Sequence, residues 1–203
     1  MKKILCILFS LTLSSIFAQE TRNYLDKINT HRTEMDKEFG DTSTSILPNE
    51  LVLNFKHLDY FKPNPEFNIL ADFKKDLGEK FFMTTSTGNK KTFRQYGVLS
   101  FTIDSKLYKL PIYQNIKLMQ HEKYKDYIFI PFTDLTNGND TYGGGRYIEA
   151  EIPTGKTYQI DFNYAFNPYC HYTTGYNCPI PPKENFLDLR IEAGEKTFNS
   201  DEQ

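Results

Sequence analysis

The sequence predicts a mainly β protein, an antiparallel sandwich or barrel with one N-terminal α-helix. Apolar side chains recur at helical spacing in residues 21–39, whereas after Pro48 several short segments alternate apolar and polar residues. Turns that contain proline or glycine separate these segments. The chain has no internal repeat and no linker long enough to divide it, so we expect a single β-rich domain over residues 19–203.

The helix is expected over residues 21–39. Its apolar stripe, at spacings of four, three, four and four residues, consists of Tyr24, Ile28, His31, Met35 and Phe39. Thr21 is suited to cap the start of this helix, and Gly40 is suited to end it.

Strands are expected in residues 51–55, 67–73, 99–103, 110–112 and 127–132. Pro131 lies in the last of these segments and has no N–H group to donate to a neighbouring strand. It therefore predicts that this segment is an edge strand.

A three-residue turn, Pro153-Thr154-Gly155, predicts a hairpin over residues 146–163. The register pairs Ala150 with Tyr158, Ile148 with Ile160, and Arg146 with Phe162. Its apolar members share one face, which supports the register. On the opposite face we expect Tyr147, Asp161 and Asn163, covered by the cysteine- and proline-rich segment that follows.

Arg146 lies at the end of the apolar face of this hairpin, where an unpaired charge would cost several kcal/mol. It therefore requires an acidic partner. Glu184 and Asp161 are the candidates, and Glu184 is preferred because the register directs Asp161 to the other face.

The first eighteen residues have the pattern of a Sec signal peptide. Lys2 and Lys3 precede an apolar run, residues 4–13, and the small residue Ala18 follows. This run is too short to span a bilayer permanently. We expect cleavage after Ala18, no membrane insertion afterwards, and a periplasmic or secreted protein.

Charge and cysteine content limit the partners. The chain has 24 basic and 26 acidic residues and no basic run with interleaved aromatic residues, so nucleic acid is not an expected partner. Without the leader, Cys170 and Cys178 remain, and in an exported chain such a pair predicts a disulfide. Zinc bound through these cysteines and His171, or two free thiols, are the alternatives. No cofactor or metal is expected.

The segment TDLTNGNDTYGGGRY, residues 133–147, is rich in glycine and in oxygen-bearing side chains. It does not have the spacing of an EF-hand, a dinucleotide-binding loop or a phosphate-binding loop. A structural turn, a ligand-contacting loop and a metal site remain the three interpretations, in that order.

Patterns of nucleophilic catalysis, such as G-x-S-x-G, and the H-E-x-x-H zinc motif are absent from the sequence. Asp161 and Glu184 are candidate catalytic carboxylates for acid–base chemistry. The structural alternative makes Asp161 an ion partner of Arg146, and Glu184 and Asn185 caps of the turn after Pro182. Whether the protein is an enzyme therefore stays open.

Two segments, DLTNGNDTYGGGRY and DFNYAFNPYC…CPIPPKENFLDLRIEAGEK, resemble the family called domain of unknown function 1684, over most of the chain after the leader. The family motif residues fall here on Thr141, Tyr142, Gly143, Gly145, Arg146, Tyr147, Asp161, Asn163, Asn167, Pro168, Cys170, Cys178, Pro179, Pro181, Pro182, Glu184, Asn185, Gly194 and Glu195. The sequence departs from the pattern at Tyr169, where a proline is usual, and at His171, where a small residue is usual. The second departure argues against a catalytic or metal-binding role for His171. The resemblance implies no established activity.

The sequence therefore predicts a rigid lid over the outer face of the hairpin, with six candidate ligand-binding residues along the seam: Arg146, Tyr147, Asp161, Asn163, Glu184 and Asn185. Seven of the 14 tyrosines lie between Tyr142 and Tyr176, and such rings commonly line pockets for sugars or other polar rings. We expect a binding or structural module with a polar pocket for a small polar or anionic ligand. The alternative is a hydrolase or lyase with a carboxylate base and Arg146 as an anion clamp.

Overall fold

The computed structural model describes the backbone of residues 2–199 and the side chains of residues 19–199. The two α-helices are α1 (Lys2–Gly40) and α2 (Asn49–Val52). The strands are β1 (Asn68–Lys75), β2 (Lys80–Thr84), β3 (Lys90–Ile103), β4 (Lys106–Asn115), β5 (Tyr127–Asp134), β6 (Arg146–Glu151), β7 (Thr157–Asp161) and β8 (Phe186–Leu187). The fold is mainly β, as the sequence predicts.

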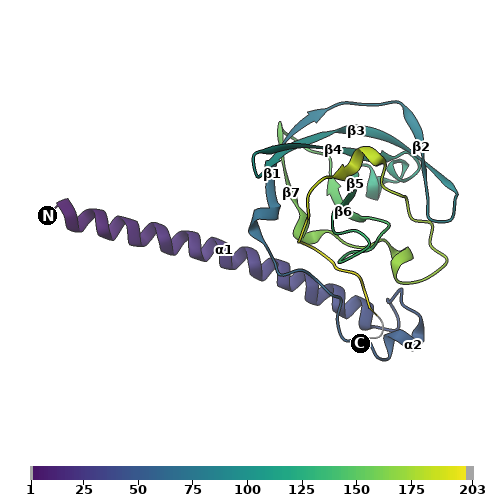
Figure 1. The fold of residues 1–203 in the computed structure, drawn as a ribbon, viewed down its shortest axis with the longest axis horizontal. Coiled ribbons are helices and arrows are strands. Elements are labelled where there is room, and N and C mark those ends of the chain that lie inside the picture. Colours follow the sequence, from purple (N-terminus) through teal and green to yellow (C-terminus); the bar gives the residue numbers. More distant parts are fainter. Residues whose placement is uncertain (1, 200–203) are drawn as a thin grey trace.

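One curled sheet contains all of these strands, in the order β6-β5-β4-β3-β1-β7. The neighbours in this order pair antiparallel, β2 pairs with β3, and the short β8 pairs parallel with β5. β6 and β7 lie at opposite ends of the order, yet residues 152–156 alone connect them. A connection of this length spans at most roughly 20 Å, so the sheet must curl until its two ends approach each other. Figure 1 shows the resulting half-barrel.

The main hydrophobic core lies inside this curl. Its fully buried members come from five different strands and include Ala71, Leu99, Leu110, Ile128 and Ile160. The segment after β8 completes this core with Ile191 and Ala193, both completely buried. The segment that follows β8 is therefore part of the core.

Helix α1 runs past the sheet, and its C-terminal half lies beside the domain (Figure 1). The predicted stripe is confirmed, because Ile28 and Phe39 are buried and the other members are half-buried. Gly40 ends the helix as expected, but Thr21 lies inside it and does not cap its start. The predicted signal peptide, residues 1–18, lies outside the part of the chain whose side chains are described. In that part, no helix is both long and apolar enough to span a membrane.

A second hydrophobic cluster attaches α1 to the domain. Phe39 packs against the ring of Tyr172 at 4.9 Å between ring centres, and Leu47, Val52 and Leu58 complete the cluster. Phe198 packs against the same group, so the last described residues lie beside the end of α1 (Figure 1).

Two strand predictions are wrong. Residues 51–55 begin in α2 and not in a strand. Pro48 starts this helical turn, and the Pro48 carbonyl accepts the N–H of Leu51 at 2.8 Å. β5 is not an edge strand, because it lies between β4 and β6. The strand β2 was not predicted.

The predicted hairpin is also wrong in its pairing. β6 pairs with β5, with Arg146 opposite Phe132, Ile148 opposite Ile130, and Ala150 opposite Ile128. β7 pairs instead with β1, where Ile160 lies opposite Ile69. The predicted faces are nevertheless correct, because the inward side chains of both strands join the core. Both strands thus find longer-range partners in place of each other.

Candidate functional site

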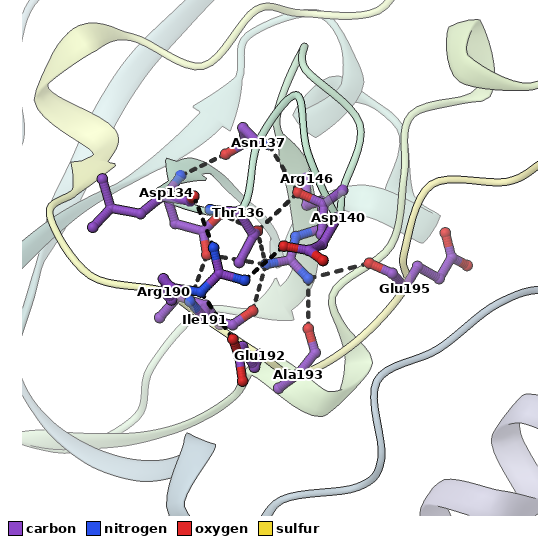
Figure 2. Close-up of polar contacts among 12 residues, drawn as sticks. Asp134, Thr136, Asn137, Asp140, Arg146, Arg190, Ile191, Glu192, Ala193 and Glu195 are labelled. Atoms are coloured by element: carbon purple, nitrogen blue, oxygen red, sulfur yellow. Dashed lines mark hydrogen bonds and ion pairs between the residues drawn. The ribbon is translucent and has the colours of Figure 1, made fainter.

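Arg146 lies at the start of β6, and its side chain is completely buried. Its Nη1 donates to the carbonyl oxygens of Ala193 at 2.5 Å and Glu195 at 3.2 Å. Its Nη2 donates to Asp134 Oδ2 at 3.3 Å and to the Ile191 carbonyl at 2.9 Å. Burial lowers the pKa of Arg146 to about 10, against the opposing effect of Asp134, so it remains charged at neutral pH. Figure 2 shows the guanidinium enclosed by these acceptors.

The partner of Arg146 is therefore Asp134, at the end of β5, and the preference for Glu184 was wrong. Asp134 is 3% exposed, and its Oδ2 also accepts the N–H of Ile191 at 2.6 Å. The antiparallel pairing of β5 with β6 brings the end of one strand to the start of the other. Because Arg146 is enclosed, it is not open to a substrate in the way that the anion-clamp alternative requires.

Residues 134–142 form the structural turn that the sequence analysis placed first. Asp134 Oδ1 accepts the Thr136 hydroxyl at 2.7 Å, and Thr136 and Thr141 share a hydrogen bond of 2.9 Å. Asn137 accepts the N–H of Asp134 and donates to the Tyr142 carbonyl. These side chains are used in holding the turn and the Arg146 ion pair (Figure 2). Within the described residues, no three His, Cys, Asp or Glu side chains are grouped as metal ligands.

The segment after β8, residues 191–195, crosses Arg146 and is named here the strap. Gly194 in the strap has a φ of 77°, a backbone conformation that favours glycine. A Cβ atom there would lie 2.5 Å from the Ala165 carbonyl oxygen, so only glycine fits this approach. Gly194 thereby allows the carbonyls on either side of it to face Arg146.

Glu195, the last residue of the strap, has a completely buried carboxyl group. Its Oε2 accepts the Tyr172 hydroxyl at 2.5 Å and the backbone N–H of Asn167 at 2.7 Å. Burial raises the pKa of Glu195 to about 7, although these hydrogen bonds and the charge of Arg146 act in the opposite direction. The carboxyl group therefore gains a proton near neutral pH.

Asp161 and Asn163 lie in a different place, against α1. Asp161 accepts the Tyr24 hydroxyl and the backbone N–H of Asn163, both at 2.9 Å. Asn163 is 1% exposed and bonds both backbone polar groups of Asn64. Asp161 thus caps the turn that follows β7 and anchors α1.

Glu184 and Asn185 point in different directions. The Glu184 side chain is 58% exposed and 3.9 Å from Lys183, whereas Asn185 is completely buried. Among the described residues, no hydrogen bond or ion pair joins Glu184 to Asp161 or Arg146. The two candidate carboxylates therefore do not form a pair, and the predicted seam of six residues is not assembled.

Asn185 fills a gap between β4 and β5. Continuing the Tyr113–Phe129 register by two residues places Pro111 opposite Pro131, and neither proline has an N–H to donate. Asn185 Nδ2 donates to both proline carbonyls, at 2.9 Å and 2.6 Å, and its Oδ1 accepts the Tyr113 hydroxyl at 2.7 Å. One amide side chain thus replaces the hydrogen bonds that the two prolines remove.

The cysteine- and proline-rich segment, residues 166–182, is the predicted lid. Phe166 exchanges both backbone hydrogen bonds with Tyr147 of β6, at 2.9 Å and 3.0 Å. Farther along, Ile180 donates to the carbonyl of Thr84 at the end of β2. Cys170 and Cys178 form a disulfide within the lid. The lid therefore bridges β6 and β2 over the outer face of the sheet.

A groove of about 300 Å³ lies between the lid and the outer face of the sheet. Seven aromatic rings line it. Phe93, Phe129 and Tyr147 are buried in the floor, β5 also supplies Tyr127, and the lid supplies Phe166, Tyr169 and Tyr176. Of the six residues predicted for ligand binding, Tyr147 is the one that lines this groove. Its hydroxyl donates to the Pro179 carbonyl, which ties the floor to the lid.

Polar side chains stand among these rings. Tyr127 donates to Glu149 Oε1 at 3.2 Å, and Lys91, Asn115 and Asn177 line the same groove. Burial raises the pKa of Tyr127 and of Tyr147 far above the usual range, so both phenols remain hydrogen-bond donors. Burial lowers the pKa of Lys91. The groove thus offers flat apolar surfaces with donors and acceptors between them.

The sequence matches the family described as "Protein of unknown function (DUF1684)" over residues 53–196. The chain belongs to the DUF1684 family. The matched range of this DUF1684 chain begins after α1 and ends just after the strap, so it contains the whole sheet, the lid and the Arg146 site.

A similar solved structure is the solution NMR structure of an uncharacterized protein of Haloarcula marismortui. It is 28% identical, and the alignment covers 88% of this chain and 97% of that chain with a TM-score of 0.66. No curated protein matches the chain. The same fold is therefore found in a solved structure of an uncharacterized protein.

Most groove residues of this DUF1684 protein were not predicted individually. Phe93, Asn115 and Tyr127 come from three different strands, and sequence spacing does not bring them together. The tyrosine-rich stretch from Tyr142 to Tyr176 was the available signal, and it does supply Tyr147, Tyr169 and Tyr176.

Proposed function

We propose that this DUF1684 protein is a binding module that holds a sugar or another small polar ring in the groove beneath the lid. The proposal rests on one observation. Aromatic rings line the groove beside polar side chains that have hydrogen-bonding groups free for a ligand. Aromatic faces pack against the apolar faces of such rings, while nearby polar groups fix their orientation.

The floor of the groove is held in one arrangement. Tyr147 lies 4.7 Å from Phe129 and 5.9 Å from Phe166, measured between ring centres, and both contacts are edge-on. The rim is more open, because Tyr169 and Tyr176 are 39% and 38% exposed. A ligand would therefore meet a rigid floor and bury the two rim rings, which lie 5.0 Å apart.

Two amides are available for hydrogen bonding. Asn115 Oδ1 accepts the N–H groups of Lys117 and Leu118, both at 3.0 Å, and Asn177 Oδ1 accepts the Thr87 hydroxyl. Among the described residues, neither Nδ2 group has a hydrogen-bond partner. The fixed oxygens set the orientation of both amides, so these donors are presented to a ligand.

The leader pattern of residues 1–18 supports the further proposal that binding takes place outside the cytoplasm, in the periplasm or after secretion. The disulfide in the lid is consistent with such a compartment.

The test is a thermal-shift and calorimetric screen of the purified protein against mono- and disaccharides and nucleosides. At least one compound is expected to raise the melting temperature. Tyr169→Ala and Tyr176→Ala should each weaken its binding about three- to tenfold, because a ring contact contributes about 1 kcal/mol. Phe186→Ala is the matched control, since Phe186 is 47% exposed and does not line the groove. If no compound binds, or if the tyrosine variants bind as tightly as the control, the proposal is wrong.

A further inference from the structure

A second hollow adjoins the groove and is strongly basic. It has a volume of about 640 Å³ and lies between β2, the start of β3 and the turn after β4. We call it the basin. Its cationic or titratable side chains are Lys80, Lys90, Lys91, Lys117 and His121.

The charge of the basin is not balanced locally. No acidic side chain lines it, and within residues 19–199 none of its four lysines forms an ion pair. Other exposed lysines do have acidic partners, because Lys106 and Lys125 pair with Asp188 and Glu122, at 2.6 Å and 2.5 Å. The whole chain has a formal net charge of −2. Four unpaired lysines around one hollow are therefore a local departure from the balanced surface.

Protection of a sheet edge explains part of this pattern and not all of it. Lysines on edge strands discourage pairing with other chains, and Lys80 lies on β2, which is such a strand. Lys91 lies on β3, which β2 covers, and Lys117 lies in a turn. These two lysines have no sheet edge to protect, yet both face the same hollow.

The basin and the groove are continuous. Lys91, Asn115 and Leu118 line both of them. Lys91 is half-buried at this junction, where a nearby anion would compensate the ammonium group for its lost hydration. Both volumes fall in the range of roughly 300–1,000 Å³ that is typical of ligand sites. A ligand longer than a single ring can therefore occupy both hollows.

We propose that the basin is an anion subsite of the groove, so that the ligand is an anionic ring compound. Its ring packs against the groove aromatics, and its carboxylate, sulfate or phosphate group lies among Lys90, Lys91 and Lys117. This inference rests on the function proposed for the groove and specifies the ligand further. An acidic oligosaccharide and a nucleotide share this chemistry.

The test uses pairs of probes that differ in charge. Trigalacturonate is compared with its methyl ester, and adenosine and guanosine 5′-monophosphates with the corresponding nucleosides, by calorimetry with the mature protein. In at least one pair the anionic member should bind about tenfold more tightly, and its affinity should fall as salt is raised. The pair that responds identifies the source of the anionic ring.

Lys90→Gln combined with Lys117→Gln should reduce the affinity for the anionic probe about tenfold, which corresponds to about 1.4 kcal/mol, and leave that for its neutral partner unchanged. Lys74→Gln combined with Lys109→Gln makes the same change of charge away from the basin and should have little effect.

Equal binding of charged and neutral probes, or equal effects of the two double variants, would overturn the basin proposal. In that outcome a loss of binding in Tyr169→Ala still supports the groove. If the lysines matter and Tyr169 and Tyr176 do not, the groove proposal fails instead. If no probe binds, the basin proposal is overturned.

Discussion

Arg146 and Asp134 form an ion pair of 3.3 Å in which both side chains are completely buried. Asp134 ends β5 and Arg146 begins β6, and the strap residue Ile191 bonds to both of them. Three segments of the chain therefore meet at one pair of charges. In this position the pair organises the fold, and the groove proposed for ligand binding lies elsewhere.

Replacing Arg146 with alanine should destabilise the protein by about 3–5 kcal/mol, because Asp134 would remain as a buried charge without its partner. Arg146→Lys should not restore stability, because an ammonium group cannot reach Asp134 and the strap carbonyls at once as the planar guanidinium does. Equilibrium denaturation in urea measures both effects.

Arg190→Ala is the control for this experiment. Arg190 forms two ion pairs, at 2.6 Å with Asp140 and 2.8 Å with Glu192, but its side chain is 45% exposed. Its loss should cost at most about 1 kcal/mol. A similar small loss for Arg146→Ala would contradict the structural role of Arg146.

Asn185→Ala should cost about 2–4 kcal/mol, because it leaves the carbonyls of Pro111 and Pro131 and the Tyr113 hydroxyl without their partner. Asn54→Ala removes an exposed amide that donates a weak 3.3 Å bond to Glu50, and it should change stability by less than about 0.5 kcal/mol. Hydrogen exchange should locate the effect of Asn185→Ala in β4 and β5. Equal stability of the two variants would refute the bridging role.

Gly194→Ala and Gly88→Ala separate backbone strain from crowding. Both glycines have nearly the same φ, 77° and 78°, so the conformational penalty of about 1 kcal/mol should be shared. A Cβ atom at Gly88 would meet no atom within 4 Å, whereas at Gly194 it would clash with two carbonyl oxygens. Thermal denaturation should show Gly194→Ala to be the less stable variant by at least about 1–3 kcal/mol. Equal melting temperatures would mean that the strap can shift at no cost.

Glu195 should make the protein less stable as the pH rises. Its pKa is about 7 in the folded state and near 4.5 in the unfolded state, so the folded state binds the extra proton between these values. The stabilising effect of that proton is complete below pH 4.5 and is lost as the pH rises through 7.

Glu195→Gln removes this titration while keeping a neutral side chain of the same shape. The unfolding free energy of the wild type minus that of Glu195→Gln should fall by about 2–3 kcal/mol from pH 5 to pH 8. The comparison also cancels the contribution of His171 to the pH dependence. Burial lowers the pKa of His171 to about 4, so its contribution to stability changes with pH in the opposite direction. A difference that does not change with pH would show that Glu195 is ionised throughout this range.

The sequence predicted the features that depend only on residues close together in the chain. The stripe from Tyr24 to Phe39 and the alternation in residues 99–103 each depend on one side being buried, and both are confirmed. The burial of Arg146 followed from the same alternation in β6. Pairing could not be read in this way. Pro153-Thr154-Gly155 favours a hairpin locally, whereas β6 and β7 pair with β5 and β1, which are distant from them in the sequence.

The error at Arg146 follows from that mispairing. The hairpin register paired β6 with β7, so Asp134 at the end of β5 was not considered as a partner and Glu184 was preferred. Asn185 was missed as a bridge for a related reason, since its role depends on Pro111 facing Pro131 across two strands. The groove combines β3, β4, β5, β6 and the lid, and no single segment of sequence contains its pattern.

The position of the strap after the last strand has a consequence for the order of folding. Three of the carbonyl oxygens that receive the Arg146 guanidinium belong to Ile191, Ala193 and Glu195, all of which follow β8 in the chain. A sheet that curled around Arg146 before these residues docked would enclose a cation with most of its acceptors missing. Closure of the sheet and docking of the strap are therefore expected to occur in one cooperative step.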